Sequence, residues 1–238
     1  MSDAPQRCND CLVRDTSLCS SLHDNELISL SRIGRRRVLP AGQVVSWAGE
    51  PSTICANIVS GSLKVTAATA DGREQIVALL FPGDFVGQLF EEDASLTVST
   101  LSQTDLCFYP RGAFERTLDD HPRMERVLLQ RTLASLNEAR GRMLALARET
   151  ARERVAGFLL DLVDRTGKAG EGGATAISIP VSRGEMADYL GLTIETVSRQ
   201  LSQMKDDGVL AFDKGGRDCR VLSRARLAAV ATPTDAGG

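Results

Sequence analysis

Three of the six cysteines in this chain lie within its first 19 residues, in the pattern Cys8–x2–Cys11–x7–Cys19. In a reducing cytosol, closely spaced cysteines indicate metal binding or redox chemistry before they indicate disulfides. Three thiolates from one short segment, with a fourth from elsewhere, are a common way to bind a [4Fe–4S] cluster. A zinc ion or a thiol-based redox switch remains an open alternative, although this spacing is not a familiar zinc-ribbon pattern.

A second motif lies at residues 182–205, SRGEMADYLGLTIETVSRQLSQMK. It predicts a helix over 183–190 with a capping box at Ser182, a tight turn at Gly191, and a second helix capped by Thr193. Apolar side chains at helical spacing supply a small core between the two helices: Ala187, Leu190, Leu192, Val197 and Leu201. The pattern predicts a helix-turn-helix.

The exposed face of the second helix presents Glu195, Ser198, Arg199 and Ser202. These side chains suit the DNA major groove, because Arg bonds guanine O6 and N7 together and Glu accepts from cytosine N4. Glu195 and Arg199 lie four residues apart, so an ion pair between them is the structural alternative.

The stretch DDGVLAFDKGGRDCRVL follows and predicts two strands around the turn 214–216, which makes the domain a winged helix. Lys214 or Arg217 on this wing could contact phosphate, although an ordinary solvated turn is an equal alternative. Cys219 on the wing is expected to be incidental, and Cys55 to be a small core residue.

Between residues 38 and 110 the chain consists of short β-rich runs separated by turn glycines: Gly42, Gly49, Gly61, Gly72 and Gly83. This regular spacing predicts a small barrel or sandwich, with a hairpin at Asp71–Gly72. Before it, DNELISLSRI predicts a helix capped by Asp24.

A long helix is expected from Pro122 to about Ala147. Its residues at alternating four- and three-residue spacing make a coiled-coil-like seam: Leu129, Leu133, Leu136, Arg140, Met143 and Ala147. Arg140, with Arg131 and Glu138 nearby, would keep a two-chain interface modest in stability. The alternative is that the stripe packs on the chain's own β-barrel. A further helix, ETARERVAGFLLDLVDRTG, ends at Gly167.

Composition limits the remaining possibilities. The net charge is −3, and residues 148–238 hold as many acidic as basic side chains, so DNA binding requires local placement of charge. Neither a membrane span nor a signal peptide is recognisable, so we expect a cytoplasmic protein. With two histidines and no paired carboxylates, catalytic triad or phosphate loop at meaningful spacing, an enzyme is not expected.

Across nearly its whole length the sequence resembles the CRP/FNR family of bacterial regulators. The resemblance rests on the glycine-punctuated β region, the long helix and the stretch DYLGLTIETVSRQL. It implies an α+β fold: a cyclic-nucleotide-binding-like β-roll, a long dimerisation helix and a C-terminal winged helix-turn-helix. The implied segments are a cysteine-bearing arm at 1–24, the β-roll at 25–120, the dimerisation helix at 121–147 and the DNA-binding domain at 148–238.

Within the FNR branch of this family, Glu195, Ser198 and Arg199 match the E-x-x-S-R triplet that reads TTGAT-like half-sites of a palindrome. The branch also uses a fourth cysteine at the end of the β-roll, which corresponds to Cys107 here. Cys107 alternates within a β-run, so a core position is its alternative. The x7 gap of the arm is wider than in enterobacterial members, although other members share it.

The resemblance implies an oxygen-responsive transcription activator. A [4Fe–4S] cluster on Cys8, Cys11, Cys19 and Cys107 would promote homodimerisation through the seam and DNA binding, and oxygen would disassemble the cluster and release the DNA. RNA polymerase is the implied protein partner. The alternative is a regulator of the same fold without a cluster, which responds to thiol oxidation or to another ligand.

Other ligands of the family are not expected. Gly87 is followed by Gln88 rather than Glu, and Leu96–Thr97 stands where an Arg-Ser pair would hold a cyclic phosphate. Haem would need a ligand from His23 or His121, both of which suit ordinary surface roles. The run Arg35–Arg37 is most simply a solvated strand edge, with a polymerase or DNA contact as the minor alternative.

Overall fold

The computed structural model describes residues 5–170, 173–213 and 218–232. The chain divides into two compact units, Met1–Leu136 and Asn137–Gly238. This differs from the four expected segments, because the cysteine arm packs with the β-roll and the boundary falls inside the long helix α4 (Pro122–Arg148). No helix of the described residues is long and apolar enough to cross a membrane.

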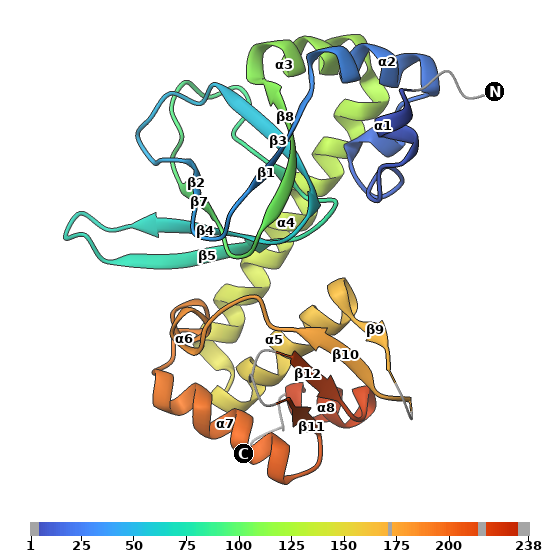
Figure 1. The fold of residues 1–238 in the computed structure, drawn as a ribbon. Coiled ribbons are helices and arrows are strands. Elements are labelled where there is room, and N and C mark those ends of the chain that lie inside the picture. Colours follow the sequence, from blue (N-terminus) through green and yellow to red (C-terminus); the bar gives the residue numbers. More distant parts are fainter. Residues whose placement is uncertain (1–4, 171–172, 214–217, 233–238) are drawn as a thin grey trace. The chain divides into compact units, whose positions relative to one another are not determined.

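The first unit contains the expected β-roll, built from two antiparallel four-stranded sheets in the orders β1-β8-β3-β6 and β2-β7-β4-β5 (Figure 1). Side chains from both sheets share one core: Ala56, Ile58, Leu63, Val65, Val86, Val98 and Leu106. The strands are β1 (Arg35–Leu39), β2 (Val44–Ser46), β3 (Ile54–Ser60), β4 (Leu63–Ala68), β5 (Glu74–Leu80), β6 (Phe85–Val86), β7 (Thr97–Thr100) and β8 (Thr104–Pro110).

The five turn glycines singled out by their spacing all have positive φ, between 80° and 94°. At Gly61 the turn also needs the absence of a side chain, because a Cβ there would lie 2.6 Å from the carbonyl oxygen of Gln103. The predicted hairpin at Asp71–Gly72 joins β4 to β5, and the N–H of Gly72 donates to the carbonyl of Thr69 (2.9 Å). The turns of the roll therefore lie at the predicted glycines, where the backbone conformation favours glycine.

Helices cover the outer face of the β3–β8 sheet: α1 (Gln6–Asn9), a 3-10 helix (Leu18–Ser21), α2 (Asp24–Ile33), α3 (Arg111–Asp120) and the start of α4. With the strands they bury a second core, which consists of Leu18, Leu22, Leu27, Leu30, Cys55, Tyr109, Phe114, Leu118 and Met124. The prediction that Asp24 caps α2 is wrong. His23 is the N-cap, its N–H donates to Glu26 (2.7 Å), and Asp24 instead pairs with Arg14.

Helix α4 has two distinct faces in its first half. Met124 is fully buried, and Val127 and Leu128 pack against the core of the first unit. On the other side, Leu129 and Leu136 are 58% and 44% exposed. Leu133, Arg140, Met143 and Ala147 are also exposed. Within the first unit, the alternative that the stripe packs on the chain's own roll is therefore wrong for Leu129, Leu133 and Leu136.

Two charged side chains expected beside the seam have partners within the chain. Glu138 forms an ion pair with Arg165 (2.6 Å), and Arg131 donates to two backbone carbonyls of its own unit. The expectation that Arg131 and Glu138 help to keep the two-chain interface modest in stability is corrected, because both side chains are held by partners within their own unit. Arg140 remains the exposed charge within the stripe.

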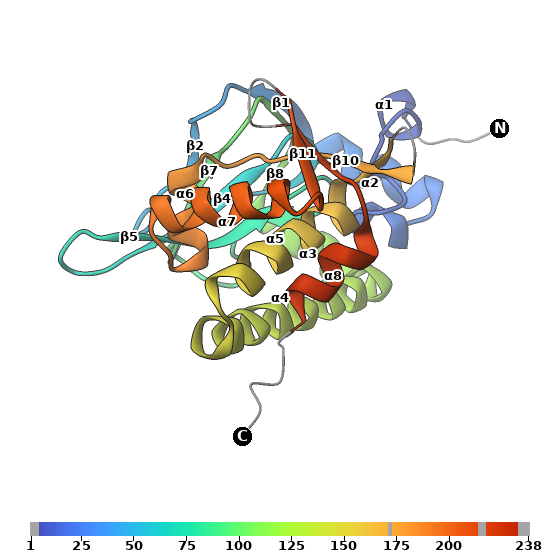
Figure 2. The same cartoon turned by 90° about the horizontal axis from the view of Figure 1, so that it is seen from below.

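The second unit is a winged helix built on α5 (Ala151–Thr166), α6 (Arg183–Leu190), α7 (Ile194–Asp206) and α8 (Arg224–Ala231). Helix α5 begins with a capping box of Thr150 and Glu153 and ends at Gly167 as predicted. Its sheet has the order β11-β12-β10-β9, with strands β9 (Lys168–Ala169), β10 (Thr175–Ser178), β11 (Leu210–Phe212) and β12 (Asp218–Val221). The short helix α8 was not predicted, and its Leu227 is fully buried. Figures 1 and 2 show α6 and α7 side by side.

Candidate functional site

Three polar side chains form a row across the outer face of one sheet. Antiparallel pairing places Arg36 of β1 and Asn57 of β3 on either side of Cys107 of β8. Because side chains alternate along a strand, Cys107 faces away from the core that Leu106 enters. The sheet thus presents a guanidinium, a thiol and an amide next to one another.

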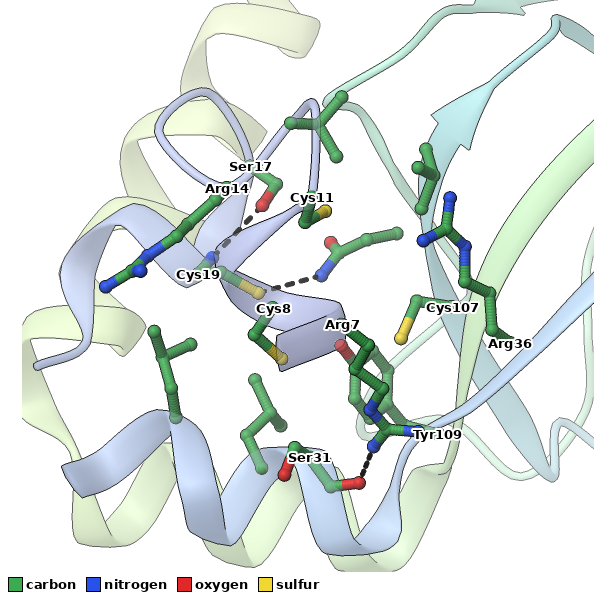
Figure 3. Close-up of a pocket in the computed structure, with 15 residues that line it drawn as sticks. Arg7, Cys8, Cys11, Arg14, Ser17, Cys19, Ser31, Arg36, Cys107 and Tyr109 are labelled. Carbon is green, nitrogen blue, oxygen red and sulfur yellow. Dashed lines mark hydrogen bonds between the residues drawn. The ribbon is translucent and has the colours of Figure 1, made fainter. Parts of the chain in front are cut away.

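The N-terminal arm places three more thiols over this row. Cys8 lies in α1, Cys11 follows it, and Cys19 lies in the 3-10 helix; with Cys107 they line a single cavity (Figure 3). All four are free and partly buried. The structure therefore brings together the four cysteines singled out from sequence, although 88 positions separate Cys19 from Cys107.

The other two cysteines lie outside the cavity. Cys55 is buried in the helix-covered core, and Cys219 is buried on β12 of the second unit. Burial raises the pKa of each thiol to about 12, so both stay protonated and unreactive at neutral pH. These positions agree with the core role expected for Cys55.

Apolar anchors and arginines hold the arm in place. Leu18 is fully buried, and Ser17 caps the 3-10 helix by accepting from the N–H of Cys19 (3.3 Å). Arg7 donates to the carbonyls of Ser31 and Gly34 at the end of α2, where unpaired carbonyls attract a cation. The arm is thus a packed part of the first unit.

The cavity is a poor environment for isolated thiolates. Burial raises the pKa of Cys19 to about 11 and raises that of Cys107. Asn57, only 2% exposed, donates from Nδ2 to the sulfur of Cys19 (3.6 Å), and its Oδ1 has no partner within the described part of the chain. A ligand that displaces these thiol protons must bring positive charge with it.

Sequence reasoning missed the arginines around the cavity. Arg7, Arg14 and Arg36 all line it. Arg36 lies on an edge strand as predicted, but it also pairs with Asp105 (2.6 Å) beside the thiols. One signal was available for Asn57, since a polar residue inside the apolar run ICANIV indicates a buried functional or structural amide.

The thiols are too widely spaced to hold one metal ion. A single zinc ion needs its sulfurs at about 2.3 Å from one point. Among the described residues, no three His, Cys, Asp or Glu side chains converge in that way. In a four-iron cluster each thiolate binds a different iron, so its cysteines surround a wider cavity. An all-cysteine donor set drawn from two segments around one cavity is of the kind that such a cluster takes.

Both histidines lie beside Glu26, away from the cavity. His121 Nδ1 is 3.5 Å from a Glu26 oxygen, and Arg123 donates to both Glu26 oxygens (2.8 and 2.7 Å) and contacts His23. These contacts join the start of α2 to the start of α4. They give the two histidines a structural role.

The helix-turn-helix forms as the local sequence dictates. Ser182 and Glu185 exchange hydrogen bonds at the start of α6 (3.2 and 2.9 Å). Gly191 ends this helix in the left-handed conformation (φ 62°), which glycine adopts without a Cβ clash. Thr193 then accepts from the N–H of Thr196 at the start of α7 (3.2 Å).

Helix α7 presents the predicted face to solvent. Its apolar side is closed by Val197 and Leu201, which are 0% and 2% exposed, while Glu195, Ser198 and Arg199 are exposed. Nowhere in the described structure does Glu195 form an ion pair with Arg199, so that alternative is wrong. Strands β11 and β12 flank the predicted wing, whereas Lys214 and Arg217 lie outside the described residues.

Each of the two units matches a known domain family. Residues 153–230 match the Crp-like helix-turn-helix domain, and residues 36–121 match the cyclic nucleotide-binding domain. The solved structure of FixK2 from Bradyrhizobium japonicum has a TM-score of 0.77 at 32% identity, covering 85% of this chain and 99% of that one.

Curated relatives cover nearly the whole chain. The transcriptional activator protein FnrL of Cereibacter sphaeroides is 39% identical over 98% of this chain and 94% of its own length. The nitrogen fixation regulation protein FixK of Bradyrhizobium diazoefficiens is 34% identical over 94% of this chain and 93% of its own. The chain therefore belongs to the CRP/FNR family and is a DNA-binding transcription regulator of the FNR/FixK type, not an enzyme.

Proposed function

We propose that this regulator is an oxygen-responsive activator that holds a [4Fe–4S] cluster on Cys8, Cys11, Cys19 and Cys107. The observation that carries this proposal is the convergence of these four cysteines on one cavity, while Cys55 is buried elsewhere. A bound cluster supplies iron–thiolate bonds between the arm and β8 that oxygen can break.

The chain's own residues prepare the cavity for such a group. Four thiolates around a [4Fe–4S] core in its 2+ state leave a net charge of about −2, and the arginine at position 7 offsets part of it, whereas those at positions 14 and 36 already pair with Asp24 and Asp105. The Nδ2–H of Asn57 stabilises charge on the sulfur of Cys19. Cys19 by itself is a poor candidate for the reactive thiol of a redox switch, because burial raises the pKa of its thiol to about 11 and leaves little thiolate at neutral pH.

We further propose that the regulator acts as a homodimer that binds a palindromic DNA site. The exposed stripe of Leu129, Leu133, Leu136, Arg140 and Met143 would pair with its copy in a second chain. Two α7 helices would then read TTGAT-like half-sites spaced about 34 Å apart through Glu195, Ser198 and Arg199. RNA polymerase is part of this proposal, because the relatives include proteins named as activators.

We further propose that the roll binds no cyclic nucleotide. In the loop where such a ligand would lie, Gln88 donates to the hydroxyl of Ser95, and the N–H of Ser95 donates back to Gln88 Oε1 (2.6 Å). This amide closes the loop on itself. It leaves no carboxylate at position 88 for a ribose hydroxyl.

The experiment that tests the cluster is an anaerobic absorption spectrum of the reconstituted protein with iron and sulfide analysis. We expect a broad band near about 400 nm with roughly four iron and four sulfide per chain, which bleaches when air is admitted. A colourless, iron-free protein would remove the sensor from the proposal and leave the regulator of the same fold.

Arg199 tests the DNA contact. Replacing it with alanine should weaken binding to a TTGAT palindrome by about 5- to 150-fold, because a bidentate pair with guanine is worth about 1–3 kcal/mol. On a DNA site whose guanine is replaced, the same substitution should lower the binding affinity only slightly. Fluorescence anisotropy with both DNAs at fixed salt measures this difference, and equal losses on the two sites would contradict the assignment.

A further inference from the structure

A single guanidinium joins the cysteine arm, the β-roll and α4. The side chain of Arg131, half-buried on α4, donates from Nη1 to the carbonyl of Gly83 (2.7 Å) and from Nη2 to the carbonyl of Thr16. Thr16 belongs to the arm, and Gly83 to the turn before β6. Both bonds are made by a charged donor, and such bonds are roughly twice as strong as neutral ones.

The arm and the turn are in close contact where Arg131 binds them. A Cβ at Gly83 would lie 3.1 Å from the Oγ1 of Thr16, so a side chain at residue 83 would require the arm to shift by a few tenths of an ångström. Thr16 precedes Ser17, which caps the helix of Cys19. Movement of the Cys19 segment would therefore displace the carbonyl that Arg131 holds.

Arg131 lies on the face of α4 opposite the exposed leucines. It continues the inward-facing set of Met124, Val127 and Leu128 at helical spacing. At 100° per residue it points about 160° away from both Leu129 and Leu133. The two bonds of Arg131 therefore help to set how far α4 is rotated about its own axis, together with the packing of the buried side chains of this helix, and with it the direction in which the leucines face.

The same helix is also tied to the helix-turn-helix. Farther along α4, Arg142 donates to the hydroxyl of Tyr189 on α6 (2.7 Å) and lies over its ring (5.4 Å from the centroid). Helix α4 therefore has an arginine contact in each of the two units, Arg131 in the first and Arg142 in the second.

We propose that Arg131 is the positioning residue that transmits order in the cysteine arm to the dimerisation face of α4. This inference rests on the proposed function, since the cluster is what would add iron–thiolate bonds between the already packed arm and β8. With the arm ordered, Arg131 binds two carbonyls. With the arm released, it keeps only that of Gly83, and α4 loses one of its restraints.

The test compares three variants with the wild type. Arg131→Gln removes the charge, Arg131→Lys keeps the charge but lacks the planar fork that binds two carbonyls, and Arg116→Gln makes the same change at an exposed position on α3. Two measurements are made on each: amide hydrogen exchange of the arm in the metal-free protein, and the dimer dissociation constant with and without the cluster.

We expect Arg131→Gln to accelerate exchange at the amides of Ser17 and Ser20, which are hydrogen-bonded within the arm, by about tenfold in the metal-free protein. It should bind as much iron as wild type, because it contacts no cysteine. In this variant, the change in the dimer dissociation constant on cluster loading should be less than about a third of the change in wild type. Arg131→Lys should be intermediate, and Arg116→Gln unchanged.

Coupling is reciprocal, so dimerisation should also protect the arm without any cluster. In metal-free wild type, arm exchange should slow above the dimer dissociation constant, and in Arg131→Gln it should not. If wild type takes up no iron, the proposed function fails while this concentration series still decides the role of Arg131. If the dimer of Arg131→Gln responds to the cluster, and its arm exchange responds to dimerisation, as strongly as in wild type, the inference is overturned, whether or not arm exchange is faster.

Discussion

Cys107→Ala should lower the iron content of the anaerobically reconstituted protein from about four to less than about one per chain. Cys107 is the only one of the four cavity cysteines that comes from the sheet, and the other three lie on one arm. Without it the arm has no thiolate partner on the roll. Iron and sulfide analysis with the visible spectrum measures the loss.

Cys55→Ala is the matched control. It removes the same atom from a neighbouring strand of the same unit, at a buried site outside the cavity. We expect it to retain full iron content at a stability cost of about 1 kcal/mol. Circular dichroism should show both variants folded without metal. Equal iron in the two variants would show that Cys107 is not a ligand.

Leu136→Asp should abolish dimerisation and weaken binding to the palindrome by at least about 100-fold. The charge would enter the centre of the exposed stripe and face its own copy, and loss of the dimer leaves each half-site bound singly. Because Leu136 is already 44% exposed in the single chain, the monomer should stay folded. Sedimentation velocity and DNA footprinting measure the two effects.

Ser135→Asp controls for the new charge. Ser135 is exposed on the same helix and lies about 100° around it from Leu136. It should keep the dimer and most of the DNA affinity. A Leu136→Asp protein that footprints normally would place the dimer interface elsewhere.

Much of the fold follows from the sequence because its signals are local. Gly191 needs a left-handed backbone, Ser182 and Thr193 satisfy helix N–H groups within three residues, and the turn glycines punctuate the roll. The stripe on α4 follows from helical periodicity alone. At Asp24 the local signal was misleading, because its neighbour His23 is the cap and Arg14 of the arm takes the carboxylate.

By itself, the sequence determined the helix-turn-helix, the glycine turns and the cysteine arm, because each depends on residues a few positions apart. Only the tertiary structure decided which groups share the cavity, since strand register sets Arg36 and Asn57 beside Cys107 and packing separates Cys55 from it. It likewise gave Arg131 its two carbonyl partners, which lie 115 and 48 residues away in sequence. No local pattern specifies such contacts, because they depend on where the folded chain brings distant backbone together.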